Sequence, residues 1–228
     1  MKSRPLFLVL LLSITAMSRA ASDKPPVVPV YEEPRHRLVF EKGHIRIFNT
    51  SIPPGDTSLF HFHENPTLYV MLNGARMRNQ NLGEEWTEPN PDIAIKNGAF
   101  VFRDYHANPQ THRVDNIGRQ SFQVIGVINS GEGKNAVSAL SSKPEVENQW
   151  FNGYRYTLAA GESTATHKHD NPVLIVQVSD GHSNVIERGV PGAEKTVVGT
   201  WSIHEGGIGH SLNNLGSDDV ELVEIEMK

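Results

Sequence analysis

The sequence predicts an all-β protein whose strands form a sandwich or barrel of the jelly-roll type. Short runs of β-branched and aromatic residues recur from about residue 37, and Asn-Gly or Asp-Gly pairs separate many of them. No stretch has a convincing amphipathic helical pattern. Many short strands at regular spacing are typical of such barrels. The clearest strand candidates are residues 44–48, 67–72, 99–102, 121–128, 173–178 and 220–227.

The composition is that of a globular protein that folds without disulfides. Of the 228 residues, 38% are hydrophobic, 21% are charged and none is Cys, which excludes a disordered chain and a disulfide-stapled miniprotein. The 21 Lys and Arg residues stand against 26 Asp and Glu residues, a net charge of -5. Without a basic surplus we expect no nucleic-acid partner. Any chemistry must use histidine, carboxylates or hydroxyls.

The N-terminal residues indicate export. Residues 1–20 combine a basic start (Lys2 and Arg4), an apolar run and small residues at the cleavage positions, which predicts a signal peptide. We therefore expect a periplasmic or extracellular protein with no membrane attachment after cleavage; an uncleaved N-terminal anchor is the alternative. The other expected units are an extended Pro-rich arm at 21–36, a first module at 37–130, a linker at 131–146 and a second module at 147–228.

An internal repeat carries most of the histidines. The segment HFHENPTLYVMLNG begins at His61, and HKHDNPVLIVQVSDG begins 106 residues later at His167. In both, a His-x-His pair is followed by an acid, by Asn-Pro and by an apolar strand. Two further similar segments, HRVDNIG and HSLNNLG, begin at His112 and His210. The repeat indicates two similar modules in tandem.

The spacing of these histidines predicts a metal site in each module. Histidines two apart on a strand project to the same face, and a third on a neighbouring strand can converge with them. Three imidazoles that leave other positions open suit Fe, Mn, Zn, Ni or Cu. Packed or surface histidines are the alternative. The predicted ligands are His61, His63 and His112 in the first module, and His167, His169 and His210 in the second.

The repeat resembles the two sequence motifs of the cupin superfamily over nearly the whole chain after residue 20. The resemblance implies two tandem cupin barrels, that is, jelly-roll or double-stranded β-helix domains. It also implies a divalent metal ion, Fe(II) first, with Mn, Zn, Ni or Cu as alternatives. The matching residues are Gly55, His61, His63, Gly74, Gly98, His112 and Asn116, and then Gly161, His167, His169, Gly181, Gly199, Gly206, His210 and Asn214.

Both modules depart from the family motif at its glutamate. Thr67 and Val173 stand where that ligand belongs. Each site would then be a neutral three-histidine set, similar to those of thiol, diketone and gentisate dioxygenases. The missing carboxylate leaves one more unit of positive charge, worth about 4 kcal/mol to an anion about 4 Å away at an effective dielectric near 20. We therefore expect an anionic, chelating ligand; a weakened, vestigial site is the alternative.

Strand parity supplies candidates for other roles. Tyr69 and Gln177 should point into their barrels with the histidines. Tyr69 could donate a proton, and Gln177 could bind the metal or a bound oxygen; ordinary barrel filling is the alternative for both. Arg103 could pair with a substrate carboxylate, although a surface position is the alternative. A carboxylate such as Glu64 or Asp170 could instead close a site.

Together these features predict an exported metalloenzyme with two cupin modules. The leading hypothesis is an oxygenase that acts on a small anionic organic substrate; "oxygenase" follows from the family resemblance alone. A metal-dependent isomerase or lyase is the nearest alternative. A non-catalytic periplasmic protein that binds metal or ligand is the other, and a fourth protein ligand would favour it. A homodimer is possible.

Overall fold

The structure, a computed structural model, describes residues 25–89, 95–134, 140 and 142–228. The expected signal peptide lies outside these residues. Within them the chain is strand and turn apart from one short 3-10 helix, η1 (Val30–Glu32). The all-β prediction is therefore confirmed. No helix in the described part of the chain is long and apolar enough to cross a membrane.

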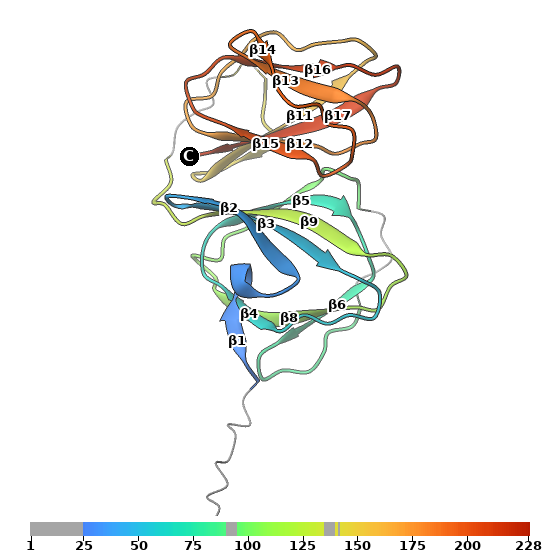
Figure 1. The fold of residues 1–228 in the computed structure, drawn as a ribbon. Coiled ribbons are helices and arrows are strands. Elements are labelled where there is room, and N and C mark those ends of the chain that lie inside the picture. Colours follow the sequence, from blue (N-terminus) through green and yellow to red (C-terminus); the bar gives the residue numbers. More distant parts are fainter. Residues whose placement is uncertain (1–24, 90–94, 135–139, 141) are drawn as a thin grey trace, which may run out of the picture.

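The first module consists of two facing sheets (Figure 1). One sheet has the strand order β1-β4-β8-β6: β1 (Val27–Pro29), β4 (Phe60–His63), β8 (Gln110–Asn116) and β6 (Met77–Asn81). The other has the order β2-β3-β9-β5-β7: β2 (His36–Lys42), β3 (Ile45–Ile52), β9 (Phe122–Asn129), β5 (Thr67–Asn73) and β7 (Phe100–Arg103).

The second module repeats this design. Its five-stranded sheet has the order β10-β11-β17-β12-β15: β10 (Val146–Glu147), β11 (Phe151–Leu158), β17 (Val220–Met227), β12 (Val173–Gln177) and β15 (Trp201–His204). A three-stranded sheet has the order β14-β13-β16: β14 (Val190–Pro191), β13 (Ser183–Glu187) and β16 (His210–Asn214).

The two five-stranded sheets pack against each other at the centre of the molecule (Figure 1). One apolar core joins Ile47 and Val70 of the first module to Val176 and Val223 of the second. The opposite faces of the same sheets line the barrel interiors, where Ile175 belongs to a separate cluster. Burial on both faces explains why these strands have nearly continuous apolar runs and are recognisable in the sequence. All six strand candidates lie in these two sheets.

The N-terminal arm packs against the first module. β1 pairs in parallel with β4, with Val28 opposite His61. After η1, the chain turns into β2, whose first residue is His36. This path places the end of the arm beside the strand that carries two of the predicted metal ligands.

Candidate metal centres

Strand pairing assembles the histidine group of the first module. His61 and His63 lie two apart on β4, and His112 on β8 is the direct antiparallel partner of His61. The Nε2 atoms of His63 and His112 lie 3.1 Å apart. One nitrogen from each of the three rings lies within 4.8 Å of the others. The three predicted ligands therefore come together in a geometry that could hold a metal ion.

Hydrogen bonds orient these rings from outside the group. His61 donates its Nδ1–H to the carbonyl oxygen of Leu59 at 2.9 Å, and His112 donates its Nδ1–H to the side-chain oxygen of Asn79. The Nε2 lone pairs of both rings are thus left for the centre of the group. Carbonyl and amide partners of this kind commonly fix the tautomer of metal-binding histidines. The ring orientation fits a bound cation.

Burial keeps the first group neutral. It lowers the pKa of His61 to about 3, with further lowering from the neighbouring His36 and His112. It also lowers the pKa of His112 to about 4, and that of His63 falls well below its ordinary value for the same reason. A metal binds the neutral imidazole. These three side chains are therefore ready to bind an ion near neutral pH without first losing a proton.

A cavity of about 430 Å³ opens beside the first group. Tyr69 lines it, as strand parity predicted, and its hydroxyl lies 3.4 Å from Nδ1 of His63. Tyr105 stacks on the His63 ring with the centroids 4.3 Å apart. Arg103 also lines the cavity and is exposed, so it puts a positive charge on the wall. The cavity has room for a small organic anion next to the histidines.

The first group has no carboxylate among the described ligand atoms that lie close together. Thr67, at the motif's glutamate position, donates its hydroxyl to the carbonyl oxygen of Asn65 at 3.0 Å. Glu64, next to His63, is exposed. The first site is therefore the neutral three-histidine set that the sequence predicts.

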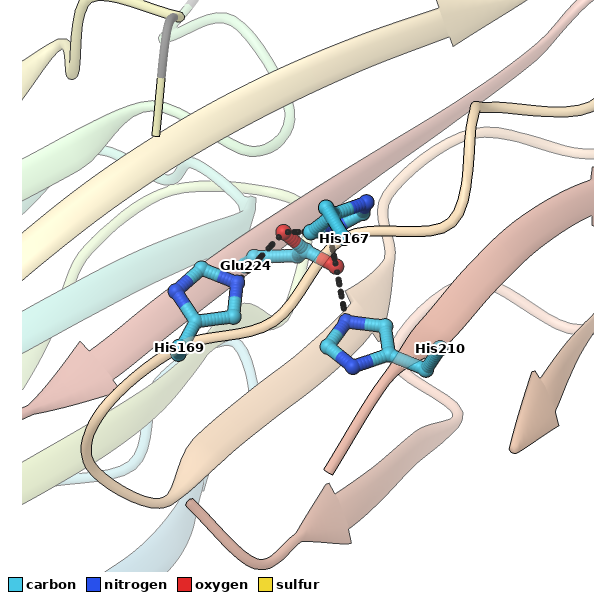
Figure 2. A group of neighbouring side chains, drawn as sticks. All are labelled: His167, His169, His210 and Glu224. Carbon is cyan, nitrogen blue, oxygen red and sulfur yellow. Dashed lines mark hydrogen bonds and ion pairs between the residues drawn. The ribbon is translucent and has the colours of Figure 1, made fainter. Parts of the chain in front are cut away.

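The second module brings its three histidines together around a glutamate (Figure 2). Glu224 on β17 accepts hydrogen bonds at 2.9 Å from Nε2 of His210 and at 3.1 Å from Nε2 of both His167 and His169. The glutamate side chain is completely buried. The three predicted ligands thus converge, but the neutral set expected here is wrong, because Glu224 supplies the carboxylate that Val173 lacks.

The glutamate reverses the electrostatics of the second group. Burial would raise the pKa of Glu224, but hydrogen bonds from the three histidines outweigh burial and hold it well below its usual value. Burial would likewise lower the pKa of His169, yet the hydrogen bond to Glu224 and the Glu226 carboxylate, 3.6 Å from Nδ1, raise it to about 9. The pKa of His167 is raised in the same way. Without metal, this group is an ion-paired cluster.

Gln177 does not serve as the fourth group of the second site. Its side-chain oxygen accepts a hydrogen bond from Ser183 at 2.6 Å, and its amide donates to the carbonyl oxygens of Ser179 and Gly181. These bonds hold the end of β12 to the following turn, so the role is structural. Asp170, the carboxylate that follows His169 in the chain, is exposed.

Sequence reasoning missed three acidic residues near the sites: Glu224 and Glu226 in the second module and Glu33 in the arm. Glu224 was recognisable in principle, because it has the same strand parity as the buried Leu222. Glu33 lies in the arm and binds His36, whose ring centroid is 4.6 Å from that of His61. Glu33 and His36 could not be recognised from the sequence, because they lie in a proline-rich segment and no motif spacing connects residues 33–36 to the histidines.

No protein-family model and no curated protein matches this sequence. Among solved structures, AerE from Microcystis aeruginosa superimposes with a TM-score of 0.62 at 15% identity, covering 91% of this chain and 100% of that chain. A cupin 2 conserved barrel domain protein from Leptotrichia buccalis gives a TM-score of 0.52 at 16% identity, covering 84% of this chain and 87% of that chain.

A third similar structure is a salicylate 1,2-dioxygenase from Pseudoaminobacter salicylatoxidans, solved as an adduct with gentisate. It gives a TM-score of 0.54 at 11% identity, covering 85% of this chain and 74% of that chain. At these identities the likeness establishes the fold alone. This chain has the cupin fold, in two tandem modules that each bring three histidines together.

Proposed function

We propose that this chain is a metal-dependent cupin enzyme whose first module carries the reacting site for a small anionic organic substrate. The observation that carries the proposal is the neutral group of His61, His63 and His112 at the wall of a cavity of about 430 Å³. A divalent ion held by three protein ligands keeps positions for substrate, and when bound it supplies Lewis-acid or redox chemistry.

The residues around the first group support an anionic substrate. Arg103 can pair with a carboxylate at the cavity wall, and the guanidinium gives a strong, oriented contact. Tyr69 and Tyr105 place two hydroxyls 3.5 Å apart near His63, so either can donate a hydrogen bond to a bound oxygen. Burial raises the pKa of both phenols above the ordinary value, which keeps them protonated as donors.

Oxygenase chemistry with Fe(II) is the reaction class we propose. The similarity in fold to a salicylate 1,2-dioxygenase solved with gentisate, a small aromatic carboxylate, supports this choice. The neutral ligand set supports it too, since an ion that keeps its full charge attracts a chelating anion. We also propose that the protein is exported, because residues 1–20 have the pattern of a signal peptide.

We assign the second group to metal binding that stabilises the module. All four side chains could hold the ion, and His169, His210 and Glu224 are buried. The carboxylate lowers the charge of the site by one unit, so it attracts a second anion less than the first group does.

Oxygen uptake tests the proposed function. Fe(II)-loaded protein is screened against small carboxylates with and without an adjacent hydroxyl, while O2 and substrate are both followed. We expect uptake that disappears in His61→Ala/His63→Ala but persists in His167→Ala/His169→Ala. Substrate loss without O2 uptake would replace the oxygenase with an isomerase or lyase. Turnover that survives only in the first-module variant would move the reacting site to the second module.

A further inference from the structure

A cleft of about 810 Å³ lies where the two modules meet, and we call it the inter-module cleft. Strands β2, β3 and β9 of the first module contribute most of its lining, and Val198 and Gly199 of the second module complete it. The modules are in close contact here, because a Cβ on Gly199 would lie 2.7 Å from Cδ1 of Leu72. None of the six convergent histidines lines this cleft.

Four polar side chains in the cleft share one face of the sheet. Arg37 on β2 is the cross-strand partner of Asn49 on β3, and Ser51, two residues further on, is the partner of Gln123 on β9. Cross-strand partners and alternate residues point to the same side of a sheet. Ile47, also on this side, packs into the apolar core between the modules. The sheet face therefore changes from apolar to polar where it enters the cleft.

The polar side chains of this face have unused hydrogen-bonding capacity. Within the described part of the chain, none of the four has a side-chain hydrogen bond, and no carboxylate pairs with Arg37. The side-chain oxygen of Asn49 is in addition enclosed by neighbouring atoms and lacks a donor. A buried acceptor without a donor is costly. Because Asn49 lines the cleft, a turn about its last side-chain bond brings its carboxamide to a donor bound there.

The cleft contains one guanidinium without a carboxylate partner. Arg35 and Asp56 also line the cleft, and they neutralise each other through hydrogen bonds of 2.9 and 2.7 Å. Arg37 is the one other charged side chain among the described lining residues, and it is exposed. The cleft therefore has a net positive charge, which favours a ligand with an anionic group.

The donors and acceptors of the cleft define the rest of the ligand. A guanidinium only donates, and it binds a carboxylate through two parallel hydrogen bonds. The carboxamides of Asn49 and Gln123 and the hydroxyl of Ser51 both donate and accept. The hydroxyl groups of a sugar do the same, so each can satisfy one of these side chains. Leu72 adds apolar surface against which the C–H groups of a sugar ring can pack.

We propose that the inter-module cleft binds an acidic saccharide. The guanidinium of Arg37 holds its carboxylate, and the three neutral polar side chains of the sheet face bond its hydroxyl groups. A neutral sugar would lose the charged contact, and a carboxylate without hydroxyl groups would leave the carboxamides unsatisfied. This site lies apart from both histidine groups and does not depend on the proposed function.

Three matched ligands test this requirement. Glucuronate, glucose and cyclohexanecarboxylate each have a six-membered ring, but glucose lacks the carboxylate and cyclohexanecarboxylate lacks the hydroxyl groups. Ligand-observed NMR titration of the full-length, Zn2+-loaded protein gives the three affinities. We expect glucuronate to bind roughly tenfold or more tightly than either of the others, because each of them loses a charged hydrogen bond or several neutral ones.

Three variants test the assignment of the side chains. Arg37→Gln should bring the affinity for glucuronate to within about twofold of that for glucose. Gln123→Glu keeps the shape of the side chain but places a negative charge near the ligand carboxylate, so it should weaken glucuronate binding roughly tenfold. Gln120→Glu makes the same change of charge at an exposed bend outside the cleft and should behave as wild type.

The outcomes separate the cleft from the first metal group. His61→Ala/His63→Ala should bind glucuronate as the wild type does. Binding that is lost in this variant but persists in Arg37→Gln would place the ligand in the barrel and overturn the proposal. Equal affinities for glucuronate and cyclohexanecarboxylate would overturn the saccharide, and no binding of glucuronate would overturn the site. Because no readout is O2 uptake, the proposed function is tested independently.

Discussion

Gly126 in the first module occupies the sheet position that Glu224 occupies in the second. Gly126 pairs with Tyr69, and Glu224 pairs with Ile175, which lies 106 residues after Tyr69, the same offset as between the His-x-His pairs. A Cβ on Gly126 would lie 2.2 Å from Cζ of Phe48. In the first module the Phe48 ring thus fills the space that Glu224 occupies in the second. For this reason the first metal group has no carboxylate, whereas the second has one.

Gly126→Ala should destabilise the protein without touching a ligand. The new methyl group overlaps the Phe48 ring, and overpacking of this kind costs about 1–3 kcal/mol of unfolding free energy. Urea denaturation measures the change. Gly74→Ala is the matched control, because its Cβ would meet Ile95 at an ordinary 3.5 Å. Adding Phe48→Leu to Gly126→Ala should recover part of the loss; equal stability of the two alanine variants would refute the overlap.

Glu224→Gln should weaken metal binding in the second module and leave the first unchanged. The substitution keeps the shape of the side chain but removes the charge that the three histidines share. We expect the affinity for the second ion to fall at least about tenfold, because even the removal of a residue that only hydrogen-bonds to a metal ligand commonly lowers metal affinity by that factor. Competition with a chelator measures it. Glu221→Gln, on the opposite face of β17, should have no effect; equal losses would show a general destabilisation.

Metal binding should release protons from the second module only. The pKa of His169 is raised from 6.5 to about 9, so the metal-free ring is protonated at pH 7.5 and must lose its proton to an ion. The rings of His61 and His112, with pKa values of about 3 and 4, are already neutral. Zn2+ added to His61→Ala/His63→Ala should therefore release about one proton per ion.

The reciprocal variant provides the control for proton release. His167→Ala/His169→Ala, which keeps only the first group, should release close to none, as measured with a pH indicator in weak buffer. The raised pKa also means that the His169–Glu224 contact stabilises the metal-free protein below pH 6.5, and this stabilisation is lost as the pH rises through about 9. Equal proton release from both variants would show that the groups do not differ in charge.

Arg103→Gln should weaken anion binding at the first site while metal content stays the same. The guanidinium lines the cavity but is not part of the histidine group. Losing a charge-assisted contact costs roughly tenfold or more in affinity. Glycolate titration of the Co2+-loaded protein measures the change. Arg46→Gln, whose arginine pairs with Glu41 on the surface, is the control, and wild-type affinity in Arg103→Gln would exclude the pairing.

The sequence is informative where a pattern is local and periodic. His61 and His63 share a face because strands have a period of two, and the repeat identifies His112 and His210 as third ligands. The most recognisable strands are those buried on both faces. The four-stranded sheet of the first module, which carries the histidines, has a more polar pattern and is located through its motif rather than its hydropathy.

The missed residues reach the sites through long-range packing. Glu224 arrives from a strand paired with β12, and its pairing register is set by the whole sheet rather than by the motif. Glu33 and His36 lie beside the first histidine group because the arm adds a parallel strand to β4. The proline-rich composition of the arm does not predict this contact. Local spacing identifies ligands on one strand, but it does not show which distant strand completes a site.

Metal content of the purified full-length protein tests most directly whether both histidine groups bind an ion. Mass spectrometry is applied to the wild type, to His61→Ala/His63→Ala and to His167→Ala/His169→Ala, each reconstituted near neutral pH. We expect about two ions per chain in the wild type and the loss of one in each variant. A wild type that binds no metal after reconstitution, or variants that retain both ions, would contradict the assignment of these groups as metal sites.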